Sequence, residues 1–67
     1  MVRIENYTNF SYQEIGYLID NIKFSSEKGT HYIGDENFLN IKFRGKSLNI
    51  TIRYLKKYAV WTFRYDE

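Results

Sequence analysis

Residues 38–65 contain three runs in which apolar and polar side chains alternate, and this pattern constrains the fold more than any other feature. The apolar members of the runs are Leu39, Ile41 and Phe43, then Leu48, Ile50, Ile52 and Tyr54, then Ala59, Trp61, Phe63 and Tyr65. Alternation with a period of two is typical of strands that bury one face and expose the other. The segment therefore predicts three antiparallel strands joined by two short turns.

Two turns set the register that we expect between these strands. Gly45-Lys46 is expected to form a two-residue turn with glycine first, which is the type II′ pattern. Residues 55–58 are expected to form a four-residue loop, because Lys56-Lys57 lacks the glycine or asparagine that a tighter hairpin turn favours. In this register apolar residues face one another, as in the pairs Phe43–Leu48, Ile41–Ile50, Leu39–Ile52, Ile52–Trp61, Ile50–Phe63 and Leu48–Tyr65.

A helix is predicted to begin at Ser11 and to end near Phe24. Ser11 and Glu14 have the spacing of a capping box, and Phe10 and Ile15 occupy the positions of a hydrophobic staple. The apolar residues that recur at helical spacing form one stripe, made of Tyr12, Ile15, Leu18, Ile19 and Ile22. We expect this stripe to pack against the apolar face of the sheet, because each element has one apolar face to bury.

Two shorter segments complete the expected fold. Residues 2–5 alternate and predict a short N-terminal edge strand, while residues 30–33 predict another strand, followed by a turn at residues 34–37. Over residues 1–67 the sequence predicts a single α+β domain. Its expected architecture is one helix packed on one face of a four-stranded antiparallel sheet, with a possible short fifth strand at the N-terminus.

Most residue types that carry out chemistry are scarce in this chain. There is no cysteine and only one histidine, His31, and the four glycines are scattered rather than grouped in a phosphate-binding loop. We therefore expect no catalytic residues, no metal site, no cofactor and no enzymatic activity. No apolar run approaches the roughly 20 residues of a membrane span, so a cytoplasmic protein without membrane contacts is expected.

The charge is distributed unevenly along the chain. Residues 38–65 hold seven of the ten basic residues and none of the eight acidic residues. Such a segment favours binding to nucleic acid, because cations that neutralise phosphates supply most of the affinity. The expected contact residues on the exposed sheet face and its turn are Asn40, Lys42, Arg44, Lys46, Asn49, Thr51, Arg53 and Arg64. A duplex is favoured over a single strand, because only Phe38 and Tyr58 remain as exposed aromatic platforms.

Two other interpretations stay open at this stage. Polar and basic residues also suit a sheet face that is merely solvated. Alternatively, the protein binds and inhibits a host protein such as a nuclease, a polymerase or a defence complex, through Tyr12, Tyr17 and Asp20 on the helix. Residues with AT-rich codons (Phe, Tyr, Ile, Asn and Lys) make up 32 of the 67 positions, which suggests a gene from a low-GC bacterium, its phage or a mobile element. Self-association as a homodimer is also open.

Overall fold

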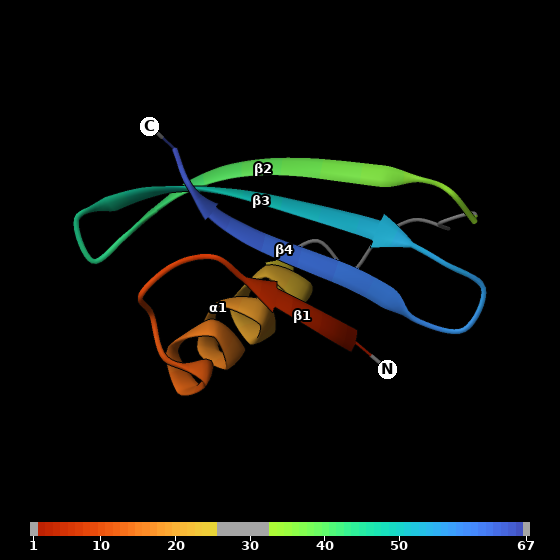
Figure 1. The fold of residues 1–67 in the computed structure, drawn as a ribbon, viewed down its shortest axis with the longest axis horizontal. Helices are drawn as coiled ribbons and strands as arrows, with labels where there is room; N and C mark the ends of the chain where they lie inside the picture. Colours follow the sequence, from red (N-terminus) through yellow and green to blue (C-terminus); the bar gives the residue numbers. More distant parts are fainter. Residues whose placement is uncertain (1, 26–32, 67) are drawn as a thin grey trace.

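The structure is a computed structural model that describes residues 2–25 and 33–66. It contains one four-stranded sheet and one helix, in the order β1 (Val2–Asn6), α1 (Tyr12–Ser25), β2 (Glu36–Phe43), β3 (Lys46–Tyr54) and β4 (Ala59–Tyr65). The strands lie side by side in the order β1-β4-β3-β2, and α1 packs on one face of the sheet (Figure 1). The predicted α+β architecture, with one helix on a four-stranded sheet, is confirmed.

The sheet is mixed, so the prediction of a purely antiparallel sheet is wrong. The short N-terminal strand was predicted, and it pairs in parallel with β4, with Val2 opposite Ala59. The chain leaves β1 at one edge of the sheet and passes through α1, and it enters β2 at the opposite edge. Val2 and Ile4 pack against the core cluster, and this burial stabilises the pairing of β1 with β4. Residues 30–32 of the other predicted strand lie outside the described residues, and Ile33 lies in a turn.

The hairpin between β2 and β3 has a different turn from the one predicted. Arg44 and Gly45 form the two-residue turn, with φ angles of 52° and 81°, and Phe43 lies opposite Lys46. Positive φ at both central residues is the type I′ pattern, which matches the natural twist of a hairpin. The expected turn at Gly45-Lys46 is therefore wrong, and β2 is shifted by two residues along β3.

The shift leaves every side chain of β2 on its predicted face, because side chains alternate with a period of two. Ile41 now pairs with Leu48, and Leu39 pairs with Ile50. The pairing between β3 and β4 is as predicted, with Ile52 opposite Trp61, and residues 55–58 form the connecting loop. The expected face of each strand is thus confirmed, although the pairing of one hairpin is corrected.

The start of α1 is fixed by the predicted capping box. The backbone N–H of Ser11 donates to Glu14 Oε1 at 2.8 Å, and the backbone N–H of Glu14 donates to Ser11 Oγ at 3.2 Å. Tyr12, however, is 74% exposed and does not belong to the buried stripe. It points within about 60° of Ile15 around the helix axis, but it is the first residue of α1 and lies at the end of the stripe.

The core lies between α1 and the two central strands. Its buried residues are Ile15, Leu18, Ile19, Leu48, Ile50, Ile52, Trp61 and Phe63. The inward residues of β2 (Leu39, Ile41 and Phe43) are only half-buried. Figure 1 shows α1 on the side of the sheet that carries β1 and β4, with β2 at the far edge. The helix therefore covers the centre of the sheet better than the β2 edge.

Substitution of two glycines by alanine should have opposite effects on stability. Gly45 has a φ of 81°, so Gly45→Ala should lower the free energy of unfolding by about 1–2 kcal/mol through backbone strain alone. A methyl group at Gly16, inside α1, would meet no atom within 4 Å. Gly16→Ala should therefore raise the free energy of unfolding by about 0.5–1 kcal/mol. Urea unfolding of both variants measures the two shifts, and a Gly45→Ala variant as stable as the native protein would contradict the assigned turn.

Candidate nucleic-acid interface

The sheet face opposite α1, here called the open face, carries most of the polar side chains of the strands. Register and alternation place the following residues on it: Arg3, Glu5, Glu36, Phe38, Asn40, Lys42, Ser47, Asn49, Thr51, Arg53, Val60, Thr62 and Arg64. Six of the eight nucleic-acid contacts expected from sequence share this face, namely Asn40, Lys42, Asn49, Thr51, Arg53 and Arg64. The alternation thus places these six residues, which come from β2, β3 and β4, on one face of the sheet.

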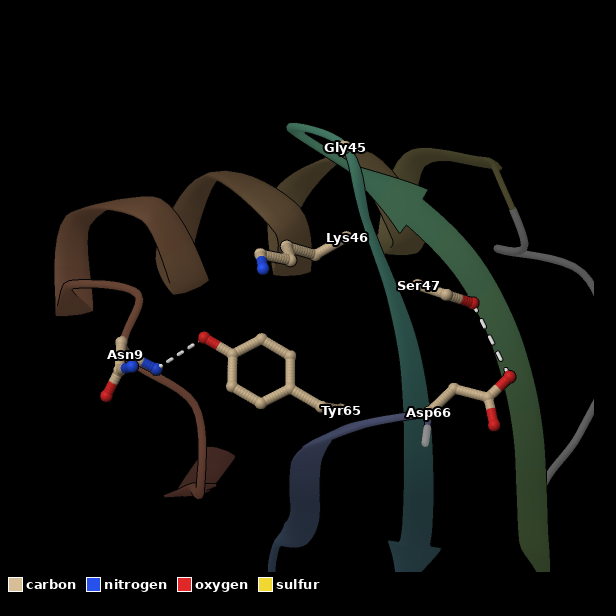
Figure 2. A pocket seen from close by; sticks show the side chains of 6 residues that line it. All are labelled: Asn9, Gly45, Lys46, Ser47, Tyr65 and Asp66. Atoms are coloured by element: carbon tan, nitrogen blue, oxygen red, sulfur yellow. Dashed lines mark hydrogen bonds between the residues drawn. The ribbon is translucent and has the colours of Figure 1, made fainter.

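The other two expected contacts, Arg44 and Lys46, are directed toward the helix. Arg44 Nε lies 3.4 Å from Glu14 Oε2, and its guanidinium lies 5.4 Å from the ring centroid of Phe43. Lys46 lies directly opposite Phe43 and therefore shares its face of the sheet. In Figure 2, the Lys46 side chain extends toward α1 and away from Asp66. These two cations are not part of the open face.

Acidic residues from outside the basic segment share the open face, and one of them lies beside a cation of that segment. Arg53 Nε is 3.8 Å from Glu36 Oε2, on the neighbouring strand. Glu5 accepts a hydrogen bond from the Thr62 hydroxyl at 3.3 Å and lies 3.9 Å from Arg3. The open face therefore carries both signs of charge. The sequence alone did not show this, because the acids come from β1 and from the first residue of β2.

Two aromatic rings project from the open face. Phe38, on the edge strand β2, is 72% exposed, and Tyr7, directly after β1, is 56% exposed. The Arg64 guanidinium carbon lies 4.0 Å from the ring centroid of Tyr7, which is the arrangement of a cation–π contact. Tyr7 was missed in the sequence analysis, because only the parallel pairing of β1 brings it beside β4.

A shallow depression lies beside Phe38, between β2 and β3. It has a volume of about 370 Å³ and is lined by Phe38, Leu39, Asn40, Asn49, Ile50 and Thr51. Asn40 Nδ2 donates to Asn49 Oδ1 at 2.9 Å and to Asp66 Oδ2 at 3.0 Å. Within residues 2–25 and 33–66, Asn40 Oδ1 and Asn49 Nδ2 have no hydrogen-bond partner. The depression therefore offers an amide acceptor and an amide donor, together with the Thr51 hydroxyl, next to an aromatic ring.

A second depression lies at the end of the sheet near the Arg44-Gly45 turn (Figure 2). It has a volume of about 410 Å³ and is lined by Asn9, Gly45, Lys46, Ser47, Tyr65 and Asp66. The backbone N–H of Asn9 donates to the Tyr65 hydroxyl at 2.9 Å, and the Ser47 hydroxyl donates to Asp66 at 3.4 Å. Most of its polar groups thus hold the segment after β1 and the end of β4 in place, which is a structural role.

The three residues expected for a protein interface are exposed on α1. Tyr12 is 74% exposed and Tyr17 is 62% exposed, and Asp20 is also exposed. Asp20 follows Tyr17 by three residues, so the two side chains share one side of the helix. Tyr17 lies 6.3 Å from the ring of Phe43, measured between centroids. This solvent-facing side of α1 is a second surface, separate from the open face.

Residues 2–25 and 33–66 contain no cluster of three or more His, Cys, Asp or Glu side chains that could hold a metal ion. His31 lies outside the described residues. No described helix has the length and apolar character that crossing a membrane requires.

Glu14 gives the stability of the fold a predictable dependence on pH. The pKa of Glu14 lies below its ordinary value of 4.5, chiefly because the backbone N–H of Ser11 donates to the carboxylate. The Ser11 side chain and the positive charge of Arg44 lower the pKa further, against a desolvation effect that raises it. A carboxyl with a lowered pKa in the folded state stabilises the protein above its ordinary pKa and loses that contribution as the pH falls.

The stability advantage of the native protein over a Glu14→Gln variant should therefore shrink as the pH falls through 4.5 and below. Glutamine keeps the shape of the side chain and can still accept the Ser11 hydrogen bond, so only the charge is removed. Urea unfolding of both proteins from pH 6 to pH 3 measures this difference. A difference that stays constant over this range would contradict the assigned role of the Glu14 carboxylate.

The chain matches no protein-family model, no curated protein and no solved structure in the comparisons with known proteins.

Proposed function

We propose that the open face binds single-stranded nucleic acid by stacking bases on exposed aromatic rings. The observation that carries this proposal is the exposure of Phe38, which is 72% accessible on a strand whose other outward residues are polar or charged. An exposed ring on a sheet surface is a platform on which a base can stack, because every base offers a flat face. Tyr7 offers a second ring on the same face, held against Arg64.

A single strand fits the open face better than the duplex that the sequence favoured. The duplex argument depended on an uncompensated basic surface, whereas Arg53 lies beside Glu36 and Arg3 lies beside Glu5. A duplex carries one phosphate per about 1.7 Å of its axis, so it favours a surface with a high density of positive charge. Stacking depends less on charge and needs exposed rings, which the open face has.

The depression beside Phe38 supports contacts to the edge of a stacked base. Asn40 Oδ1 can accept a hydrogen bond and Asn49 Nδ2 can donate one, and the two residues lie directly opposite each other on β2 and β3. An amide acceptor beside an amide donor matches the paired donor and acceptor groups on the edges of nucleobases. Phe38 and Tyr7 lie at opposite edges of the sheet, separated by three strand spacings (about 14 Å) across the strands and by two residues (about 7 Å) along them. A strand of several nucleotides is therefore needed to reach both.

Removal of either aromatic ring should weaken binding to a single-stranded oligonucleotide. Phe38→Ala and Tyr7→Ala should each raise the dissociation constant by about 5- to 150-fold, because stacking contributes about 1–3 kcal/mol per base. Tyr12→Ala is the matched control, since it removes an exposed tyrosine from α1 and should leave the affinity unchanged. Fluorescence anisotropy with a labelled twelve-nucleotide DNA and RNA measures the affinities, and circular dichroism checks that the variants are folded.

The dependence on salt separates this proposal from purely electrostatic binding. If Lys42, Arg53 and Arg64 contact about three phosphates, the logarithm of the association constant should fall with the logarithm of salt concentration at a slope near −2. Binding to single strands should exceed binding to a duplex of the same length. No binding at low salt, or equal affinities for Phe38→Ala and the native protein, would refute the proposal.

The exposed side of α1 supports a second function, which is binding to another protein. Tyr12 and Tyr17 are among the most exposed large side chains of the described residues, and tyrosine is enriched at the energetic centres of interfaces. In this case Tyr17→Ala should abolish co-purification of a specific partner from the host, whereas Phe38→Ala should not. Mass spectrometry of the captured material tests this, and capture of the same proteins by Tyr17→Ala would count against it.

A further inference from the structure

The outer edge of β2 is a long strand edge whose backbone groups have no strand partner within residues 2–25 and 33–66. β2 is the last strand in the sheet order, and no described residue pairs with its outer edge. Phe43 and Lys46 flank a two-residue turn, so they form a hydrogen-bonded pair, and such pairs recur at every second residue. The backbone N–H and C=O groups of the intervening residues therefore point outward, away from β3. These residues are Glu36, Phe38, Asn40 and Lys42.

The charges of these four residues suit antiparallel pairing with a second copy of the same strand, because the negative end of one strand then meets the positive end of the other. Glu36 is at one end of the row and Lys42 is at the other, with two uncharged residues between them. If a second copy of β2 pairs antiparallel about a two-fold axis at Leu39, each Glu36 lies opposite Lys42 of the other copy. The same register pairs Phe38 with Asn40 and uses all eight outward-facing residues of the two strands. Moving the register by two residues loses both opposite-charge pairs.

The side chains of β2 that face the helix also favour a two-fold axis at Leu39. Leu39 is only half-buried in the single chain, because α1 covers the centre of the sheet better than this edge. About a two-fold axis at Leu39, its side chain would pack against Leu39 of the second copy. On the open face the two Phe38 residues would be diagonal neighbours, with about 7–8 Å between their positions on the strands, which is within the reach of aromatic side chains.

We propose that the protein forms a homodimer through antiparallel pairing of β2 with β2 of a second copy, centred on Leu39. A charged residue on an edge strand often prevents such pairing, but that protection comes from like charges meeting. Here the opposite charges at the two ends attract in the antiparallel register. The product is one continuous sheet in which the open faces of both copies lie on the same side. This inference is independent of the proposed binding to nucleic acid, and it is tested without nucleic acid.

Two charge reversals and their mixture test the dimer. Lys42→Glu makes both cross-strand pairs Glu–Glu, and Glu36→Lys makes both pairs Lys–Lys. Each variant alone should raise the dimer dissociation constant roughly tenfold or more, because two attractive pairs become repulsive. An equimolar mixture of the two variants should form dimer again, because a β2 strand with two glutamates then pairs with a β2 strand with two lysines. Sedimentation equilibrium from about 1 μM to 1 mM measures all three samples, a range chosen because the pairing of two edge strands buries less area than a standard interface.

Lys57→Glu is the matched control, because it makes the same charge change in the loop after β3, away from β2. It should leave the dimer dissociation constant within about twofold of the native value. Circular dichroism and urea unfolding check that each variant keeps the fold. A native protein that stays monomeric up to 1 mM would overturn the proposal. So would a dimer that both single reversals leave intact, or a mixture that shows no recovery.

Discussion

The contact of α1 with the two central strands is the interaction on which the rest of the molecule depends. Ile15 of the helix and Leu48 and Phe63 of the sheet have no exposed surface at all. A chain of 67 residues buries only about 60% of the surface of its unfolded form, and the buried apolar residues described here form a single cluster at this interface. The opposite sheet face therefore lacks a covering layer and carries polar residues, and the sheet edges are only partly covered.

Alternation along the strands was enough to predict which face each residue occupies, but not the pairing of β2 with β3. A shift of two residues keeps Leu39, Ile41 and Phe43 on the apolar face, so both registers satisfy the hydrophobic pattern equally well. The turn decides between them. The type I′ turn with Gly45 second requires positive φ at Arg44, and it aligns Glu36 with Arg53 across the strands.

The other features that the sequence did not reveal come from contacts between distant segments. No local pattern states that β1 pairs in parallel with β4, and hence none places Tyr7 beside Arg64 or Glu5 beside Thr62. The basic character of residues 38–65 was correctly read from composition. Its partial neutralisation depends on Glu14 and Glu36, which lie outside that segment and meet its cations Arg44 and Arg53 only after folding.

The parallel pairing of β1 with β4 also bears on the order in which the chain can fold. Val2 pairs with Ala59, so the first strand gains its only described strand neighbour from the last one. A polypeptide emerging from the ribosome can form the β2–β3 hairpin early, because those contacts are local. Closure of the sheet must wait for the C-terminal strand to be synthesised. Until then β1 and the apolar stripe of α1 lack most of their partners, and this nascent state is where chaperones or aggregation would act.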